Sequence, residues 1–379
     1  MKKKHLLAVV LSVILILSNN LATYAMEETK DNYSPEEFVL EQIAIIGRND
    51  VSCPWSEETE IVDKIVLFDL QHIPNGYVFK LETDDVESGF IQVHDTSGIY
   101  SVYCYAFEGD SEVECMMNYW NINEDSIPYI YFLGSFQYLI DGNEGEYINL
   151  ATNDNVMCDK NQLQTMEVEY LNKIKENPLI ITEDTIQSTF DVVEQQKGRA
   201  GFTWPIMSDF TDITIVVNNE TYPVTDHCTP TAATAILKYL NYLGWSDCSE
   251  GQSTRETFAK MYVALNTNEC RFDDWFNSGG GTARSQIAPG IRWYASQNNY
   301  TITADKALLN TLSGMKSHLD NNQLLLVSVD DFGGYSGGHS IVVTGYSSNT
   351  LYIQNGWSRT RVTYSYSSLN IAQYVYVGA

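Results

Sequence analysis

Cys228 stands at the start of a predicted helix, where a thiol is readily ionised. Pro230 suits the first helical turn, because its missing N–H has no intrahelical partner to lose there. Apolar residues then recur at helical spacing as far as Leu240, and Gly244 is placed to end the helix. A thiol at a helix N-terminus feels the positive end of the dipole and the unpaired N–H groups, so its thiolate is favoured. The alternative is a small buried cysteine at a helix end.

A nucleophilic cysteine needs a base, and His339 is the histidine best placed to be one. It stands at the start of a strand predicted over 340–346, directly behind Gly337 and Gly338. The two glycines let another backbone come close to the start of that strand.

The other two histidines of the second half are poorer candidates. His227 directly precedes Cys228, so its side chain is poorly placed to face the thiol. His318 falls on the polar flank of a helix predicted over 305–321, where we expect water to surround it.

Asn355 follows a predicted strand over 351–354, and a turn at 347–350 joins this strand to the one that begins after His339. We therefore expect both residues near one end of a hairpin, with Trp357 covering them from water. An amide oxygen there can accept from the imidazole N–H and fix its tautomer for the cysteine. Asn355 and Gly356 alone are equally typical of a plain turn, so the order Cys, His, Asn carries the prediction.

The second half of the chain, residues 201–379, is predicted to be an α+β domain, because helices come first and antiparallel strands last. Its further helices are predicted over 253–265 and around 291–295, and its strands over 324–329, 340–346, 351–354, 361–366 and 373–377.

The first half, residues 26–200, is predicted to be α+β and mainly antiparallel β. A capping box of Ser34 and Glu37 opens a helix that runs to about Gly47. A second helix ends before Pro178, and the polar stretch over 177–200 is typical of a linker. Strands separated by turn signals are predicted over 65–70, 77–81, 90–94, 100–107 and 113–119.

The N-terminus reads as a secretory signal peptide cleaved after Ala25. Lys2 to Lys4 form a basic region, and an apolar run follows over 6–17. No second apolar run follows, so we expect a secreted protein with no membrane span in its mature chain. The net charge of −27 argues against nucleic acid as a partner. The sequence has no HExxH motif and no paired CxxC, so neither a metal nor another cofactor is expected.

Seven cysteines leave one unpaired if the others form disulfides, which export permits. Two bridges within the first half and one between Cys248 and Cys270 would leave Cys228 as the free thiol. A two-residue turn at 109–110 would place Cys104 opposite Cys115, close enough to bridge. His72 and His94 lie among the first-half strands without ligand-like spacing and are expected on the surface.

Residues 225–232, followed by 236–239, resemble the nucleophile helix of streptopain-like cysteine peptidases. The stretch 228–233 is also similar to the Cys-Gly-Pro-Thr-Ala pattern of bacterial peptidases of the bacteriocin-processing type. Both groups have the papain-like fold, and the Gly-Gly-His and Asn-Gly-Trp stretches match their later motifs. The resemblance implies a peptidase that acts on a peptide or protein through an acyl-enzyme, with Cys228 as nucleophile, His339 as base and Asn355 as its orienting residue.

The resemblance extends to the first half at lower specificity. The stretches 67–70, 76–81 and 89–93 are similar to strands of streptopain-type inhibitory prodomains. Residues 26–200 would then be a proregion, an intramolecular partner of the peptidase domain, and the full chain a zymogen.

One position departs from the family pattern. Tyr222 stands where these peptidases usually carry a glutamine that donates to the oxyanion. The backbone N–H of Cys228 remains as one donor, and Asn218, Asn219 or Thr225 is a candidate for the second. Losing one such donor typically raises the barrier by about 2.7–4 kcal/mol. Two alternatives therefore stay open: an inactive papain-like secreted binding protein, and an amidase or acyl transferase that uses the same triad.

Overall fold

The described part of this computed structural model comprises residues 33–50, 52–123, 127, 129–142, 146–151, 154–156, 159–181, 189–191, 202–217, 220–246, 248–269, 281–330 and 338–378. The predicted signal peptide, Cys158, Cys270, Asn218 and Asn219 lie outside these residues. Across the ranges given, no helix combines the length and the apolar character needed to cross a bilayer.

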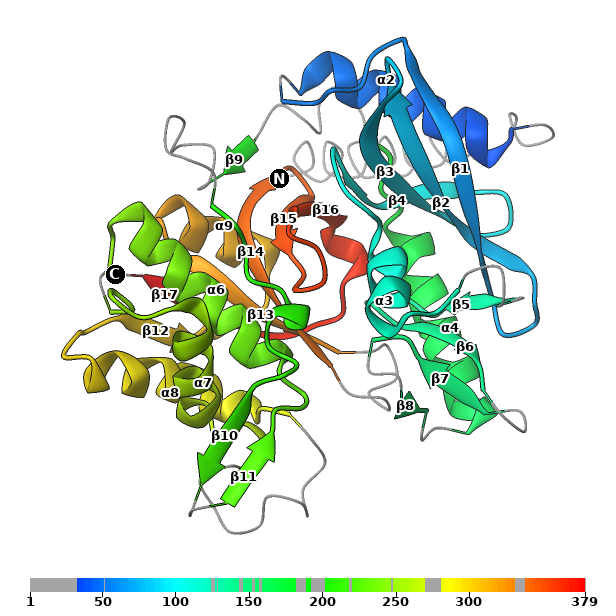
Figure 1. Cartoon of the computed structure of the whole chain (residues 1–379). Coiled ribbons are helices and arrows are strands. Elements are labelled where there is room, and N and C mark those ends of the chain that lie inside the picture. Colours follow the sequence, from blue (N-terminus) through cyan, green and yellow to red (C-terminus); the bar gives the residue numbers. More distant parts are fainter. Residues whose placement is uncertain are drawn as a thin grey trace, which may run out of the picture.

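One large, mostly antiparallel sheet runs through both halves of the chain (Figure 1). Its C-terminal part has the order β12-β17-β13-β14-β15-β16, and its N-terminal part continues as β4-β3-β2-β1-β5-β6-β7-β8. The C-terminal strands are β12 (Thr303–Lys306), β13 (Leu324–Val329), β14 (His339–Ser347), β15 (Thr350–Gln354), β16 (Val362–Ser365) and β17 (Ile371–Gly378). The N-terminal strands are β1 (Thr59–Phe68), β2 (Pro74–Thr83), β3 (Val86–Asp95), β4 (Tyr100–Ala106), β5 (Ile130–Phe132), β6 (Tyr138–Asp141), β7 (Tyr147–Asn149) and β8 (Asp154–Asn155).

In the C-terminal half, α6 (Cys228–Leu243) lies against β13 and β14 and packs on the helix that follows it. Almost every residue of α6 is buried, and Gly244 ends it in the left-handed conformation with φ 72°, as predicted. The other helices are α7 (Thr254–Ala264), α8 (Arg284–Gln297) and α9 (Leu312–Asp320), and a small ribbon of β10 (Thr214–Val217) and β11 (Glu220–Pro223) stands apart from the large sheet.

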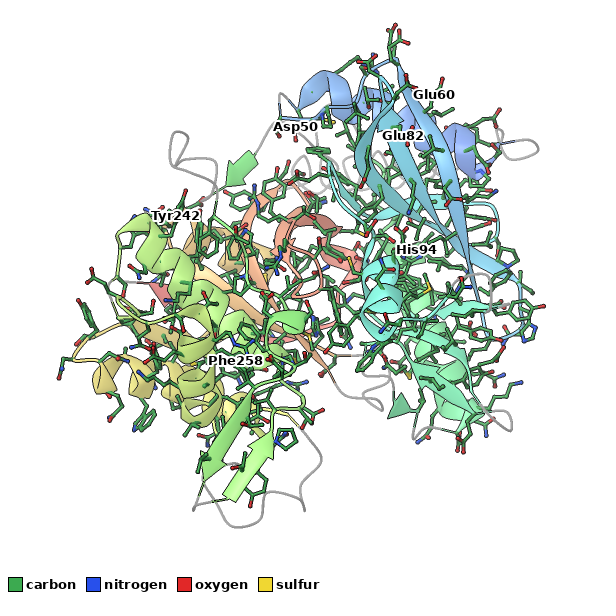
Figure 2. All side chains as sticks on the ribbon, in the orientation of Figure 1. Asp50, Glu60, Glu82, His94, Tyr242 and Phe258 are labelled. Carbon is green, nitrogen blue, oxygen red and sulfur yellow. The ribbon has the colours of Figure 1, made fainter. Side chains whose placement is uncertain are left out.

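The N-terminal half buries its first helix, α2 (Pro35–Asn49), against β3. The predicted capping box of Ser34 and Glu37 is present at its start. Figure 2 labels Glu60 on β1 and Glu82 on β2, which lie opposite each other in the register of these two strands. Such a like-charge pair weakens a ribbon slightly and is tolerated where water screens it.

The stretch predicted as a strand over 113–119 is a helix, α3 (Glu112–Trp120). Ser111 and Glu114 form a capping box, a local signal that overrides the β-branched and aromatic residues that follow. Because there is no hairpin, Cys104 and Cys115 do not lie opposite each other, and both thiols are free. The expected bridge between them is therefore wrong.

Three other expectations are corrected by packing between distant segments. The stretch predicted as one helix over 305–321 splits into strand β12 and helix α9. The helix expected around 291–295 is the longer α8. His94 is 1% exposed rather than on the surface, because β3 and α4 (Lys160–Glu176) enclose it (Figure 2).

The two halves share their sheet and one hydrophobic core. β4 pairs with β16 through two residue pairs, Thr363 with Tyr105 and Tyr364 with Cys104. The core cluster joins side chains of both halves, such as Phe136 and Tyr138 with Ile341 and Tyr364. In addition, β9 (Thr189–Asp191) pairs with β14. The N-terminal region is thus packed directly against the strands that follow the predicted nucleophile helix.

Candidate active site

Cys228 is the first residue of α6 and is half-buried. Asp226 has a positive φ of 49°, which turns the chain sharply into the helix. The hydroxyls of Thr229 and Ser340 lie 2.7 Å apart, so the start of α6 is tied to the start of β14. The thiol is thereby held where the helix N-terminus meets the strand that carries His339.

His339 is 8% exposed and begins β14. If Gly338 were replaced by a larger residue, its Cβ would lie only 2.5 Å from the carbonyl oxygen of Val329. This confirms the expected close approach of a second backbone. The rings of Trp357 and Phe136 cover the imidazole, with ring centroids 6.1 Å and 5.4 Å away.

The tautomer of His339 follows from its partners. Its Nε2 lies 2.6 Å from the backbone oxygen of Asn355. A carbonyl oxygen can only accept, so Nε2 must carry the proton, and Nδ1 is left to face the thiol. The side chains of His339 and Cys228 share a hydrogen bond. This is the arrangement in which an imidazole can take a proton from a thiol.

Opposing effects set the two pKa values. Burial by itself raises the pKa of the Cys228 thiol, but the His339 hydrogen bond and charge, with hydrogen bonds from Ser340 and Thr229, bring it below its ordinary value. Burial lowers the pKa of His339, and its contacts with Cys228 and the Asn355 carbonyl more than compensate, so it is raised. Both shifts favour a thiolate–imidazolium pair.

Asn355 lies beside His339 as predicted, but it uses a different atom. Its side-chain oxygen accepts from the backbone N–H groups of Trp357, at 2.9 Å, and Ser358, at 3.1 Å. The carbonyl of its backbone holds the imidazole instead. The tight turn after β15 brings two N–H groups to the amide oxygen, which is why it is not available to the ring.

Glu112 is the residue at this site that the sequence reasoning missed. Its carboxylate accepts from the side-chain amide of Asn355, at 3.1 Å, and from the hydroxyl of Tyr364, at 3.0 Å. It is 1% exposed, and burial raises its pKa to about 7. The capping box around it was a readable signal for its helix, but not for its contact with a residue 243 positions away.

The other two histidines have separate partners. His227 is buried as the N-cap of α6, with its Nδ1 3.2 Å from the hydroxyl of Thr231, and burial lowers its pKa to about 4. His318 is stacked on Tyr376 at 3.9 Å, with its Nδ1 2.7 Å from the side chain of Gln323. It is therefore half-buried rather than surrounded by water.

The second oxyanion donor stays a prediction. Tyr222 lies on β11 and packs against the apolar side chains behind the small ribbon. The hydroxyl of Thr225 accepts from the side chain of Asn268 at 2.8 Å. Asn268 also donates to the hydroxyl of Tyr262, so it holds the turn that precedes Cys228.

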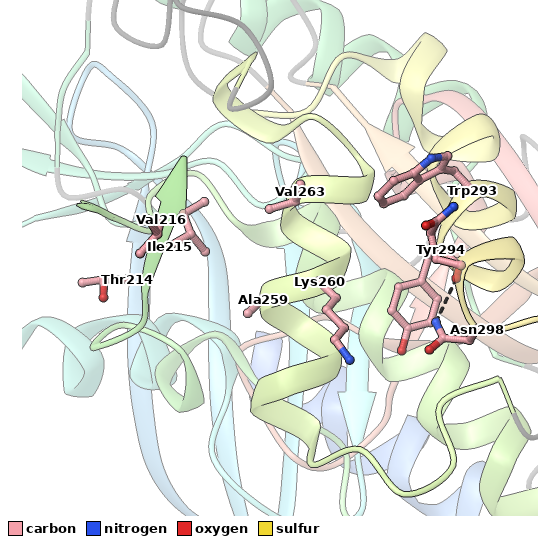
Figure 3. A pocket seen from close by; sticks show the side chains of 10 residues that line it. Thr214, Ile215, Val216, Ala259, Lys260, Val263, Trp293, Tyr294 and Asn298 are labelled. Atoms are coloured by element: carbon pink, nitrogen blue, oxygen red, sulfur yellow. Dashed lines mark hydrogen bonds between the residues drawn. The ribbon is translucent and has the colours of Figure 1, made fainter. Parts of the chain in front are cut away.

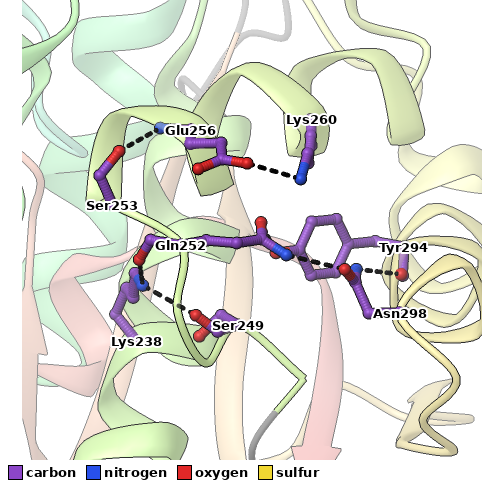
Figure 4. Close-up of polar contacts among 8 residues, drawn as sticks. All are labelled: Lys238, Ser249, Gln252, Ser253, Glu256, Lys260, Tyr294 and Asn298. Atoms are coloured by element: carbon purple, nitrogen blue, oxygen red, sulfur yellow. Dashed lines mark hydrogen bonds and ion pairs between the residues drawn. The ribbon is translucent and has the colours of Figure 1, made fainter.

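A polar network joins α6 to the segment that precedes α7 and, through it, to the C-terminal end of α8 (Figure 4). Lys238 on α6 donates to the backbone oxygens of Ser249 and Gln252. The side chain of Gln252 in turn donates to Asn298 at 2.7 Å and accepts from the hydroxyl of Tyr294 at 2.9 Å. These contacts tie α6 to α8 through residues 249–252.

An open, mainly apolar pocket of about 500 Å³ lies between β10, α7 and α8, away from Cys228 and His339 (Figure 3). Ile215, Val263 and Trp293 line it, with Lys260 and Asn298 at its polar edge. No group of three or more metal-ligating side chains occurs within the residues that the structure describes.

The geometry and the family comparison point to the same class. Residues 210–378 match the model of the Peptidase_C39 like family. The chain is a cysteine-type peptidase. None of the curated proteins matches the chain.

Two solved structures are similar to part of it. A putative C39-like peptidase from Bacillus anthracis is 10% identical, with a TM-score of 0.29, and the match covers 46% of this chain and 97% of that one. The interpain A cysteine protease of Prevotella intermedia is 14% identical, with a TM-score of 0.31, over 52% and 97% of the two chains. Neither likeness assigns a role to a residue of this chain.

Proposed function

We propose that Cys228 is the nucleophile and His339 the base of an endopeptidase, with Asn355 orienting the imidazole through its backbone carbonyl. The observation that carries the proposal is the Nε2 proton donated to that carbonyl, which leaves Nδ1 against a thiol at a helix N-terminus. The thiolate sulfur bonds to the carbonyl carbon of the substrate, and the imidazolium returns its proton to the leaving amine. Water, deprotonated by the imidazole, then hydrolyses the thioester to free acid and thiol.

Selective alkylation tests this proposal. Iodoacetamide, followed by mass spectrometry of the folded chain, is expected to label Cys228 ahead of the other cysteines, and His339→Ala is expected to abolish the selectivity. A folded wild-type chain whose Cys228 stays unlabelled has no activated thiol. Hydrolysis of peptides by the wild type but not by Cys228→Ala then separates a peptidase from an inactive relative.

We further propose that the chain is exported and that residues 26–200 are a proregion which keeps the site covered. The basic and apolar N-terminal pattern supports export. Support for a covering proregion comes from Phe136, which lies against His339 and belongs to the N-terminal half. N-terminal sequencing of protein purified from culture medium tests both ideas: a start near 180–201 supports a removed proregion, and a start at Met26 with full activity contradicts it.

An inactive binding protein is the second candidate, and Tyr222 favours it. Peptidases of this type usually carry an oxyanion donor at that position, and Tyr222 packs against apolar side chains. Selective labelling of Cys228 without hydrolysis of any peptide in a random library would support this candidate.

A further inference from the structure

A buried carboxylate joins the N-terminal half to the candidate active site. Glu112, the first residue of α3, is 1% exposed. Its Oε1 accepts from Asn355 and from Tyr364, and its Oε2 accepts from the hydroxyl of Tyr138 at 3.4 Å. Two of these three donors belong to the C-terminal half, so the carboxylate is shared between the halves.

The fold fixes where this carboxylate lies. The capping box of Ser111 and Glu114 sets the first turn of α3, and Val113, Met116 and Met117 bury the helix in the shared core. The pairing of β4 with β16 brings Tyr364 beneath it. Glu112 therefore reaches Asn355 from a rigid element rather than from a loop.

Asn355 passes this restraint on to His339. Its side-chain nitrogen is held by Glu112, its side-chain oxygen caps the turn at Trp357, and its backbone carbonyl accepts from the imidazole. Moving the side chain would move the peptide group that orients the ring. Through these three hydrogen bonds of Asn355, a carboxylate of the N-terminal half restrains the orientation of the proposed base, His339.

The electrostatic interaction between Glu112 and His339 also links the N-terminal half to the candidate active site. The titratable groups that face Glu112 are Cys115 on α3, Tyr103 and Cys104 on β4, Tyr138 on β6, Tyr364 on β16 and His339 on β14. Among these groups His339 alone becomes a cation, and its charge and that of Glu112 stabilise each other. A buried anion next to an imidazolium is worth more than an exposed one, because little water screens it.

We propose that Glu112 is a positioning residue for His339, supplied by the N-terminal region, which assembles the Cys228–His339 pair in the full-length chain. The inference rests on the proposed function of that pair. It assigns the N-terminal region two effects: Phe136 covers the imidazole, while Glu112 holds it in working orientation. Latency of the precursor would then come from restricted access, with the thiol already activated.

The rate of Cys228 alkylation by iodoacetamide in the full-length chain, measured across neutral pH, tests the inference. Glu112→Gln keeps the shape of the side chain and removes its charge. Since burial raises the pKa of Glu112 to about 7, the wild type and the variant should react equally well in acid and diverge above that pH. We expect the variant to react about tenfold more slowly there, the factor that corresponds to one pKa unit.

Glu114→Gln is the matched control, because Glu114 lies on the same turn of α3, is similarly buried and binds Ser111 and Lys80 instead of Asn355. It should follow the wild type at every pH. Equal rates for Glu112→Gln and the wild type over the whole range, or a faster variant, overturn the inference while leaving Cys228 reactive. An unreactive wild-type thiol overturns the proposed function itself, and the inference with it.

Tyr364→Phe provides the second variant if Glu112→Gln does not fold. The Tyr364 hydrogen bond lowers the pKa of Glu112, so its loss should move the rise in reactivity to higher pH. An unchanged pH profile in a folded Tyr364→Phe chain also contradicts the inference.

Discussion

His94 in the N-terminal half and His339 in the C-terminal half are both buried and both stacked on an aromatic ring, yet their acid–base behaviour is opposite. His94 lies 5.2 Å from the ring of Phe132, and burial lowers its pKa to about 3. His339 lies 6.1 Å from the ring of Trp357, and its pKa is raised. His94 contacts aromatic rings, the hydroxyl of Tyr170 and the backbone of Asn75, and the Asn75 hydrogen bond offsets only part of the effect of burial. His339 interacts with a thiol, a backbone carbonyl and the carboxylate of Glu112, and together these partners more than offset the effect of burial on its pKa.

The largest expected effect is the loss of peptide hydrolysis on removal of His339, the proposed base. His339→Ala should lower the rate of peptide hydrolysis by about 10²–10⁴-fold, the range for loss of a general acid–base group. His94→Gln, which also removes a buried imidazole, should leave the rate per folded molecule within a few-fold of the wild type. Steady-state kinetics on the two variants and the wild type make the measurement. Equal losses in both variants would show that the difference between the two sites has no catalytic meaning.

The second prediction concerns stability in acid. His94 is neutral when folded, with a pKa of about 3, and takes up a proton near its ordinary value of 6.5 when unfolded. The unfolded chain binds more protons between these values, so the free energy of unfolding falls as pH decreases from 6.5 towards 3, by on the order of 5 kcal/mol for this group. Urea unfolding over that window should show a shallower slope for His94→Gln. An unchanged slope would mean that His94 is charged in the folded protein.

Glu112 should act in the opposite direction and to a smaller extent. Its folded pKa of about 7 lies above its ordinary value of 4.5, so the folded chain binds more protons between the two. Stability from this group is present below 4.5 and is lost as pH rises through about 7, by about 3 kcal/mol. Glu112→Gln should remove this loss, and Glu114→Gln should retain it. Unfolding curves at two pH values, one at each side of the window, distinguish the outcomes.

The smallest expected effect refines the description of His94. Tyr170→Phe removes the hydroxyl that contacts the imidazole of His94. We expect a loss of about 1 kcal/mol in the free energy of unfolding, typical of one hydrogen bond, with no change in the alkylation rate of Cys228. A change in that rate would show that the two histidines are coupled through the shared core.

The sequence predicted those parts of the site that depend on neighbours along the chain. The start of α6 at Cys228, its end at Gly244 and the hairpin of β14 and β15 all follow from local periodicity and turn signals. The orienting atom of Asn355 was missed, because a short turn after β15 redirects the side chain. Patterns of residue type do not specify which oxygen of an asparagine faces a ring.

The first half was predicted less well, because its structure depends on long-range pairing. The alternation of apolar residues over 113–119 suited a strand, and the capping box at Ser111 was the stronger signal. The burial of His94 needs β3, β4 and α4 to close around it, and no local pattern contains that information. Glu112 is the clearest case, since its partners Asn355, just after β15, and Tyr364, on β16, come from the far end of the chain.

The short pairing between β4 and β16 has a consequence for the solubility of the C-terminal half in isolation. β16 is an interior strand only because β4 pairs with it. Without β4 it becomes a free sheet edge that carries the apolar Val362 and Tyr364, and such edges recruit strands from other molecules. Residues 202–379 expressed alone should therefore form oligomers or aggregates. An added extended peptide that pairs with the free edge of β16 should suppress this self-association. In the full-length chain we therefore expect β4 to shield this edge from other molecules.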